Sequence, residues 1–476
     1  MLNFYPQKVF EYFEKISSIP HGSYNTEKIA DYLVAFAKDK NLDYKRDKSN
    51  NVVIFKDAAV GKEKTEPIIL QGHTDMVCAS EGEFDFINNS ITLDTDGKFL
   101  FAKGTTLGGD NGIAVAMMLA LLDLGEDMPP LECVFTSDEE VGMLGANALD
   151  MSCLRGKRMI NIDSEVEGVF TIGCAGGVSC NITSQFSRHN AAHLSYKLEV
   201  IGLHGGHSGV EINRGYANGI KVACDFLSQV SKEYPVEIVS LNGGQAENAI
   251  PKSVECIFLI DGDECIDYLN SVADKITNLI KKSYNEPSVT IKISYEGACV
   301  ATSLDRESSE NVISLIDSLP NGVLSYDEKH DNSVKTSCNI GVVELNENLL
   351  NLKIGLRSSV NNDRDALASS INSIASLLGA SCEFSGMYPA WEPKSDSYLT
   401  KKAVELYKSM YGKEPVVEVI HAGLECSVFS DRISDFDCVS IGPNLIGIHT
   451  PEEKVEISSV GRVYDYVWEL LKSFNE

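Results

Sequence analysis

The first third of the chain alternates between two hydrophobic periods. Residues 26–41 place apolar side chains at helical spacing, with Ser23 and Asn25 as candidate N-caps, and residues 111–124 are typical of a buried helix. Short apolar runs predict buried strands at 52–55, 68–71, 131–136 and 159–162. This βαβ rhythm predicts an α/β domain that has a mostly parallel sheet with helices on both faces.

The pattern changes after the CAGG turn at residues 174–177. The strands that follow alternate apolar and polar side chains, which is typical of a sheet with one exposed face. A first run predicts strand, helix, strand, strand, helix and strand at 196–202, 217–233, 236–241, 254–260, 264–284 and 288–295. A second run predicts helix, strand, strand, helix and strand at 308–319, 339–345, 350–357, 363–378 and 381–385. We expect these runs to form two ferredoxin-like halves of one inserted α+β lid domain.

The α/β pattern returns near the end of the chain. It predicts a helix at 397–411, strands at 416–420 and 438–441, and a closing amphipathic helix at 460–474. The insertion therefore interrupts a single catalytic domain. The expected domains are residues 1–180 with 391–476 for the catalytic domain, and residues 181–390 for the insertion.

Composition narrows the class of protein. A chain of 476 residues is too long for one ordinary core. The formal net charge of -28 repels nucleic acid and anionic membranes, so neither is expected as a partner. The longest apolar stretch, residues 113–122, is too short to span a bilayer, and the N-terminal residues lack a signal-peptide pattern. Thirteen cysteines without a C-x-x-C pair indicate free thiols in a reducing compartment, so we expect a cytoplasmic protein.

Five short acidic or histidine-bearing segments stand out. They are QGHTDMV, LGGDNGI, TSDEEVG, NIDSE and IGIHTPEE, at residues 71–77, 107–113, 136–142, 161–165 and 446–453. Four of them follow a predicted strand, and LGGDNGI opens a helix. Ligands of open α/β sheets bind outside the carboxyl ends of the strands, so we expect the five segments to converge.

The segments contain the side chains that two borderline-soft metal ions need. Each segment alone is weak evidence, because an aspartate at a helix start is usually a cap. Together they supply one bridging carboxylate and two terminal ligands for each ion. Two dications would be balanced by three carboxylates and a bound hydroxide. We therefore expect two Zn²⁺ ions, with Co²⁺ or Mn²⁺ as alternatives, held by His73, Asp110, Glu140, Asp163 and His449.

Two neighbouring carboxylates are left for other tasks. Asp75 lies two residues after His73 and is expected to hold its imidazole. Glu139 stands beside the ligand Glu140 and is expected to be the general base for the metal-bound water.

The chain resembles a known enzyme family along essentially its whole length. The resemblance is carried by the five segments together with IPHGSYNTEKI, HGGHSG, ENAIP and IHAGLEC. The family is the di-zinc group that includes carboxypeptidase G, aminoacylase, succinyl-diaminopimelate desuccinylase, tripeptidase and carnosinase. These extra motifs look like its Xaa-His dipeptidase branch.

The resemblance assigns the metal ligands by position. It implies that His73 and Asp163 are terminal ligands of one zinc, that Glu140 and His449 are those of the other, and that Asp110 is the bridge. It also implies a non-proline cis peptide directly after the bridging aspartate, between Asp110 and Asn111.

The insertion carries further residues that the resemblance marks. His207 in HGGHSG looks like the lid histidine that polarises the scissile carbonyl, with His204 as second choice. Asn248 in ENAIP is a candidate substrate contact. In relatives with a short lid, such a histidine and asparagine come from the partner subunit. Because the lid is doubled here, we expect one chain to complete its own site. The chain can still form a homodimer, but dimerisation is not needed to supply a catalytic residue.

Three more residues are candidate substrate contacts. Arg357 in GLRSS suits a C-terminal carboxylate because its planar fork pairs with both oxygens. Gly423 and Glu425 in HAGLEC could face the substrate, and Glu425 is a candidate for binding its free amine.

The leading expectation is a metal-dependent dipeptidase that hydrolyses Xaa-His and related dipeptides with a metal-bound hydroxide and a glutamate base. A deacylase of N-acyl amino acids would use the same metals, but HGGHSG and IHAGLEC favour the dipeptidase. A non-catalytic metal-binding homologue is the third alternative. The presence of Glu139 argues against it, because a storage site needs ligands and no base.

Overall fold

The computed structural model describes residues 2–124, 126–329 and 333–474. The chain forms two compact units. The first unit comprises Met1–Cys174, Trp391–Val419 and Leu424–Glu476, and the second comprises Ala175–Ala390 and Ile420–Gly423. The second unit is thus built almost entirely from one long internal segment.

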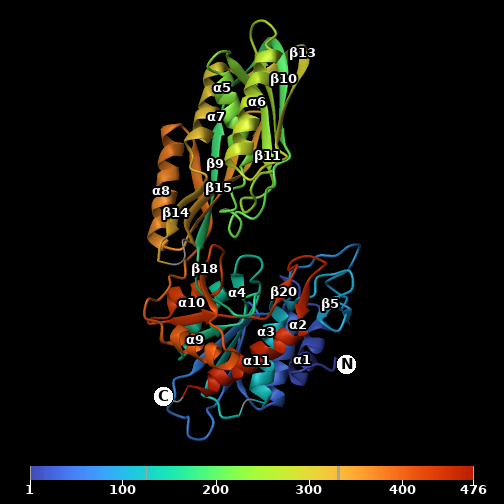
Figure 1. The fold of residues 1–476 in the computed structure, drawn as a ribbon, viewed down its shortest axis with the longest axis vertical. Helices are drawn as coiled ribbons and strands as arrows, with labels where there is room; N and C mark the ends of the chain where they lie inside the picture. The colour runs from blue at the N-terminus through green and yellow to red at the C-terminus, as the bar shows by residue number, and fades with distance from the viewer. Residues whose placement is uncertain (1, 125, 330–332, 475–476) are drawn as a thin grey trace. The chain divides into compact units, whose positions relative to one another are not determined.

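The first unit is built on an eight-stranded sheet with the order β1-β2-β6-β3-β7-β19-β8-β18 (Figure 1). Its central strands β6, β3, β7 and β19 run parallel, as the βαβ rhythm predicted. The pairs β1–β2, β2–β6 and β19–β8 are antiparallel, so the sheet is mixed at its sides. The strands are β1 (Asp43–Arg46), β2 (Val52–Lys56), β3 (Ile68–His73), β6 (Leu131–Thr136), β7 (Arg158–Asn161), β8 (Val169–Cys174), β18 (Val416–Ile420) and β19 (Asp437–Ser440).

Both faces of this sheet are buried at its centre. Every residue of β3 and β6 is buried, as expected for strands covered on two sides. Ile68 and Leu70 join a hydrophobic core with five helices, whereas Ile69 points the other way and is also buried. Those helices are α1 (Gln7–Ser17), α2 (Glu27–Asp39), α3 (Gly109–Leu124), α9 (Tyr398–Tyr411) and α11 (Ile457–Lys472). The short helix α10 (Cys426–Arg432) packs against α4 (Leu144–Ala148), β8 and β19.

A small antiparallel sheet lies at the side of the first unit. Its order is β20-β21-β5-β4, and its strands are β20 (Leu445–Ile446), β21 (Lys454–Glu456), β5 (Phe99–Ala102) and β4 (Leu93–Thr95). Residues 447–453, which contain His449, form the connection between β20 and β21.

One detail of the first unit corrects a prediction. Helix α2 begins at Glu27 with Thr26 as its N-cap residue, and Thr26 makes no side-chain capping hydrogen bond. Ser23 and Asn25 are therefore not caps. The Ser23 hydroxyl instead donates a hydrogen bond to the Asp75 carboxylate, because a tertiary partner at 2.8 Å competes for it.

The second unit contains one nine-stranded antiparallel sheet. Its order is β13-β10-β12-β11-β15-β16-β9-β17, with β14 paired to β15. The strands are β9 (Gly176–Gln185), β10 (Arg188–Ile201), β11 (Val236–Gly244), β12 (Val254–Ile260), β13 (Thr290–Leu304), β14 (Gly322–Asp327), β15 (Ser333–Asn346), β16 (Leu349–Ser358) and β17 (Ser381–Tyr388). The helices are α5 (Gly219–Val230), α6 (Ile266–Ser283), α7 (Arg306–Ser318) and α8 (Asn361–Leu377).

The sheet consists of two ferredoxin-like halves, and one is nested inside the other. The first half runs β10-α5-β11-β12-α6-β13 without interruption. The second half uses β9 as its opening strand and continues with α7, β15, β16, α8 and β17 after the whole first half. The sequence pattern predicted two consecutive halves, and the second predicted half lacked an opening strand. The structure supplies that strand from β9, which precedes the first half. Pairing of β11 with β15 joins the halves into one sheet.

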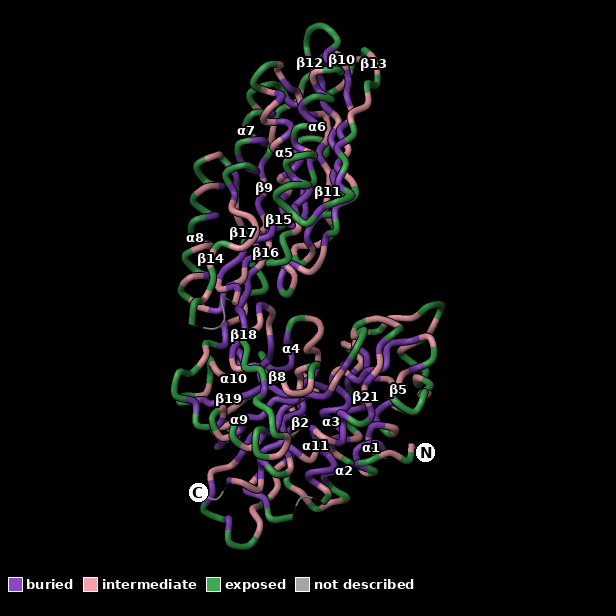
Figure 2. Tube along the Cα trace, viewed as in Figure 1, coloured by how far each residue is buried: buried purple, intermediate pink, exposed green. Residues whose placement is uncertain are grey.

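Burial follows the predicted alternation in the second unit. Along β16 the side chains of Leu350, Leu352, Ile354 and Leu356 are buried in the core, and the residues between them are more exposed. The helices contribute to this core from one face, and Figure 2 shows buried strand positions interleaved with exposed ones. The sheet therefore has one covered face and one largely exposed face.

Two expectations about the whole chain can be compared with the structure. All thirteen cysteines are free thiols. Among the described residues, no helix combines the length and apolar character needed to cross a membrane.

Candidate active site

The parallel strands of the first unit bring three of the five segments to one edge of the sheet. His73 is the last residue of β3, and its register partner Thr136 is the last residue of β6. Asn161 ends β7 beside Gln71 of β3, so Asp163 leaves the same edge two residues later. Glu139 and Glu140 follow β6 in the same way. Convergence of the segments is thus a result of parallel pairing.

Asp110 lies between the two candidate histidine ligands. Its Oδ1 is 3.2 Å from Nε2 of His73, and its Oδ2 is 3.3 Å from Nε2 of His449. The two oxygens of one carboxylate therefore face two different imidazoles, which is the arrangement that a bridging ligand requires. The peptide bond between Asp110 and Asn111 is cis, as expected.

The remaining candidate ligands complete two groups around Asp110. His73 Nε2 is 3.5 Å from Asp163 Oδ1, and His449 Nε2 is 3.0 Å from Glu140 Oε1. In the set His73, Asp110 and Asp163, and again in the set Asp110, Glu140 and His449, the ligand atoms all lie within 4.8 Å of one another. The structure thus brings all five predicted ligands together, with Asp110 shared by both sets.

The charges of this cluster suit cations. Burial alone would lower the pKa of His73, but Asp163 and Asp110 raise it well above its usual range. Hydrogen bonds to Asp110 and Glu140 raise the pKa of His449 to about 10. The carboxylates therefore favour a positive charge on the neighbouring imidazoles. A divalent ion that displaces the imidazole protons would balance the carboxylate charges in the same way. Imidazole and carboxylate donors in this number fit zinc or a similar divalent metal.

Asp75 and Glu139 lie directly beside the ligands. Asp75 is 1% exposed, and its Oδ1 is 3.4 Å from Nδ1 of His73. The same carboxylate accepts hydrogen bonds from the backbone N–H of Glu139 at 2.9 Å and of Glu140 at 3.3 Å. Asp75 therefore connects the β3 segment to the β6 segment. Burial, reinforced by Asp163 and Glu425 and opposed by His73, raises the pKa of Glu139 well above its usual range, which suits a proton acceptor at neutral pH.

Comparisons with known proteins agree with this geometry. The family model described as Peptidase family M20/M25/M40 matches residues 69–473. The chain is 36% identical over 473 residues to the cytosol non-specific dipeptidase of Escherichia coli (strain K12), covering 98% of this chain and 97% of that protein.

This chain belongs to peptidase family M20/M25/M40.

Solved structures of this family have the same fold. The aminoacylhistidine dipeptidase from Vibrio alginolyticus matches with a TM-score of 0.90 and 35% identity, covering 100% of this chain and 98% of that one. The aminopeptidase PepT from Bacillus cereus matches with a TM-score of 0.58 and 14% identity, covering 99% of this chain and 100% of that one. The second likeness shows the fold alone.

Glu425 is placed behind the ligands of this peptidase. Its side chain has no exposed surface, and its Oε2 accepts hydrogen bonds of 2.6 Å from Gln71 and from Thr136. Among the described residues, Oε1 has no hydrogen-bond partner. Burial raises the pKa of Glu425 to about 8. Glu425 was a candidate for binding the free amine of a substrate. To make this contact, the amine would have to reach a fully enclosed carboxyl group.

Several residues that support the cluster were missed by the sequence reasoning. Asn111 accepts a hydrogen bond from the His73 backbone N–H and donates one to the Ile162 carbonyl, which ties two ligand segments together. Gln71 receives a hydrogen bond of 2.6 Å from Asn161. Asn111, Gln71 and Asn161 all stand inside the five segments, so polar side chains among apolar, buried neighbours were an available signal.

In the second unit, His207 and Asn248 come from neighbouring loops. The backbone N–H of Ser208 donates to the Asn248 carbonyl at 2.8 Å, and His207 pairs with Ala249 in a β-bridge. Nδ1 of His207 accepts hydrogen bonds of 3.2 Å from the N–H groups of Gly209 and Val210. Because Nδ1 is an acceptor, the neutral ring carries its proton on Nε2, which is the form that can donate to a carbonyl oxygen.

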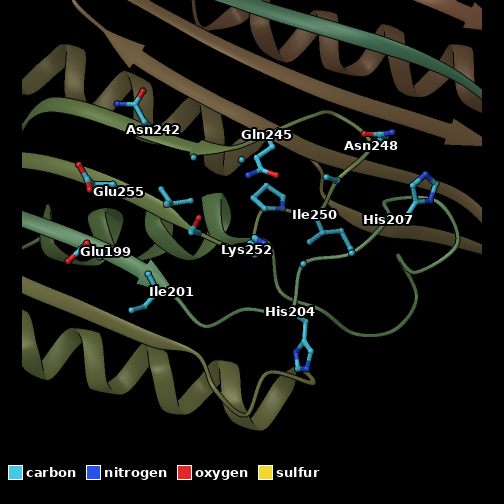
Figure 3. A pocket seen from close by; sticks show the side chains of 18 residues that line it. Glu199, Ile201, His204, His207, Asn242, Gln245, Asn248, Ile250, Lys252 and Glu255 are labelled. Atoms are coloured by element: carbon cyan, nitrogen blue, oxygen red, sulfur yellow. The ribbon is translucent and has the colours of Figure 1, made fainter. Parts of the chain in front are cut away.

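His204 has structural contacts instead. Its Nδ1 lies 2.9 Å from Glu286, whose carboxylate is fully buried, and its ring stacks on Tyr216 at 5.0 Å. His204, His207 and Asn248 all line one cavity of about 670 Å³. Figure 3 shows His207 and Asn248 close together and His204 at another point of the cavity wall. This arrangement favours His207 over His204 as the reactive histidine.

Arg357 and Gly423 also belong to the second unit. Arg357 lies near the end of β16, where it pairs in register with Ser337 and Gly177, and it donates to the Tyr388 hydroxyl at 3.0 Å. Gly423 closes the short segment Ile420–Gly423 that is assigned to this unit.

Proposed function

We propose that this chain is a two-metal dipeptidase that hydrolyses Xaa-His and related dipeptides. The single observation that carries the proposal is the shared carboxylate of Asp110, whose two oxygens face His73 and His449 within two complete ligand sets. A partly buried glutamate, Glu139, stands beside that cluster. The relatives named as dipeptidases are more than a third identical over nearly the whole chain, and this supports the same substrate class.

The metal centre that we propose uses His73 and Asp163 on one side, Glu140 and His449 on the other, and Asp110 between them. Two Zn²⁺ ions fit these donors best, with Co²⁺ or Mn²⁺ as alternatives. When bound, the metals supply Lewis-acid activation of water and of the scissile carbonyl.

Glu139 handles the protons of the reaction. It takes a proton from the attacking water and later delivers it to the leaving amine, and its raised pKa makes it a stronger proton acceptor than an exposed glutamate. Asp75 keeps His73 and the backbone of Glu139 in register for this transfer.

The second unit supplies the contacts to the organic part of the substrate. In this proposal it acts as a lid, and residues 1–180 with 391–476 act as the catalytic domain that it serves. Nε2–H of His207 polarises the scissile carbonyl, Asn248 contacts the substrate backbone, and Arg357 pairs with the C-terminal carboxylate. Gly423 leaves room beside them. One chain supplies all the residues of its own site, whether or not it forms a homodimer. The proposed location of the protein is the cytosol.

A panel of substrates tests the proposed function. Wild-type protein loaded with Zn²⁺ or Mn²⁺ is assayed on dipeptides, including Xaa-His, and on matched N-acetyl amino acids. We expect turnover of dipeptides at least tenfold better in kcat/KM than of N-acetyl amino acids. The reverse preference would identify a deacylase, and loss of all turnover with both metals bound would identify a non-catalytic homologue.

A further inference from the structure

A buried carboxylate outside the ligand set holds the loop that carries Asp110. Glu453 is 2% exposed, and four successive backbone N–H groups donate to it. Those of Leu107 and Gly108 reach Oε2 at 2.8 and 3.1 Å, and those of Gly109 and Asp110 reach Oε1 at 2.8 and 3.2 Å. Both oxygens of Glu453 are therefore engaged by the segment that ends in the bridging aspartate.

The LGGD sequence explains why four N–H groups can converge. The four N–H groups precede the regular part of helix α3, because Asp110 (φ -84°, ψ 102°) and Asn111 (φ -117°, ψ 22°) have non-helical backbone angles. They are therefore available to donate to a side chain. Gly108 has a φ of +65°, which turns the preceding N–H groups toward the same side and forms a concave anion site. A Cβ at Gly109 would lie 3.2 Å from Glu453 Oε1 and 2.8 Å from a Leu445 methyl group, so a larger residue would disturb the contact.

Glu453 also belongs to the loop that delivers another candidate ligand. It follows His449 by four residues, and the turn between them is closed by the N–H of Thr450 to the Gly447 carbonyl and that of Glu453 to the Thr450 carbonyl. His449 Nε2 faces Asp110 Oδ2 at 3.3 Å. One loop therefore contacts the bridging residue twice, because its imidazole faces the Asp110 side chain and its carboxylate accepts from the Asp110 backbone.

We infer that Glu453 is a positioning residue of the metal centre, which fixes the direction of the Asp110 carboxylate relative to His449. The inference rests on the proposed two-metal function. A bridging carboxylate must present each oxygen to a different ion, so a small rotation of its backbone would weaken both sites at once. Glu453 belongs to none of the three candidate ligand groups that the described residues form, so it acts through Asp110 and does not bind the ions.

Metal binding by the full-length protein tests the inference without substrate. Glu453→Gln keeps the shape of the side chain but replaces one acceptor oxygen with a donor, which leaves two of the four N–H groups unpaired. We expect its affinity for Zn²⁺ or Mn²⁺, measured by calorimetric titration of metal-depleted protein, to fall about 10–100-fold, as for other partners of metal ligands. Glu452→Gln removes the same charge from the adjacent, exposed residue and should bind both ions like wild type.

Thermal unfolding of the metal-depleted proteins separates positioning from simple stability. If Glu453→Gln melts earlier but binds both ions with wild-type affinity well below its Tm, the positioning role is wrong. Should that variant fail to fold, Glu453→Asp replaces it, with a shorter side chain that reaches fewer N–H groups and an intermediate loss of affinity. Wild-type affinity in Glu453→Asp would then overturn the inference. Because the readout is metal binding, a failure of dipeptide turnover alone would count against the proposed function and leave the role of Glu453 standing.

Discussion

The two sheets of this protein place their candidate functional residues in different ways. In the first unit, the parallel strands β3, β6 and β7 end at one edge, and three of the five candidate ligands lie at or within a few residues of those ends. In the second unit, an antiparallel sheet presents His207 and Asn248 on loops and Arg357 near a strand end. A parallel edge collects distant segments automatically, whereas each residue of an antiparallel sheet needs its own loop or register.

The burial of the two sets differs accordingly. His73 and Asp75 are almost fully enclosed, and Glu425 has no exposed surface. His207 belongs to a half-exposed loop beside an open cavity. In the proposed function, the enclosed residues of the first unit suit electrostatic control of the metals, and the more exposed loops of the second unit suit contact with the substrate.

The largest effect is expected at Glu139. Glu139→Gln keeps the size of the side chain but cannot accept the proton of the attacking water, so kcat should fall about 10²–10⁴-fold. KM and the content of bound metal should stay close to wild type, because the amide side chain would occupy the same space as the carboxylate. Steady-state kinetics and elemental analysis measure both, with the exposed Glu83→Gln as the matched control. Near-wild-type kcat with both metals bound would remove Glu139 from its role.

The next prediction concerns the origin of His207. Inactive Glu139→Gln protein is mixed with inactive His207→Ala protein under conditions of subunit exchange. If each chain completes its own site, every mixed dimer has one defect per site and remains inactive. Recovery of up to half the wild-type activity per mixed dimer would mean that His207 acts across a subunit interface. That result would contradict the single-chain model. The activity of each variant measured alone provides the baseline.

The smallest effect is an acid sensitivity of the second unit. His421 is 7% exposed with Nε2 at 2.7 Å from the Ser337 hydroxyl. Burial, helped by the charge of Arg357, lowers its pKa to about 3. The unfolded chain, with a pKa near 6.5, binds a proton in the interval where the folded chain does not. Stability contributed by neutral His421 is therefore complete above about pH 6.5 and is lost as the pH falls toward 3.

Chemical denaturation between about pH 4 and 7 measures this slope, which for one group is at most about 1.4 kcal/mol per pH unit. His421→Gln can still bond to Ser337 and cannot be protonated, so it should flatten the curve. An equal slope in wild type and His421→Gln would contradict the prediction.

Local elements followed closely from the sequence. Strand β6 has the predicted bounds, and the predicted helix at 111–124 lies within α3. The five candidate ligands converge as expected. Three of them stand at or after the ends of buried strands, a pattern that is encoded by residues adjacent in the chain. The alternation of β16 likewise reveals its exposed face without knowledge of its partners.

Long-range partners were decided by the tertiary structure alone. The hydrophobic period of a strand and its composition do not determine which strand it pairs with. The place of β9 in the second half and the pairing of β11 with β15 were therefore not predictable from the sequence pattern. Ser23 matches a helix cap as well as a partner of Asp75, and only the fold brings that carboxylate within 2.8 Å. Glu425 and Glu453 differ little from surface glutamates in sequence. Glu425 is buried against Gln71 and Glu453 against the LGGD loop, and each contact joins residues more than 300 positions apart. Enclosing a carboxylate costs free energy unless hydrogen-bond donors surround it, and here only the folded chain brings those donors together.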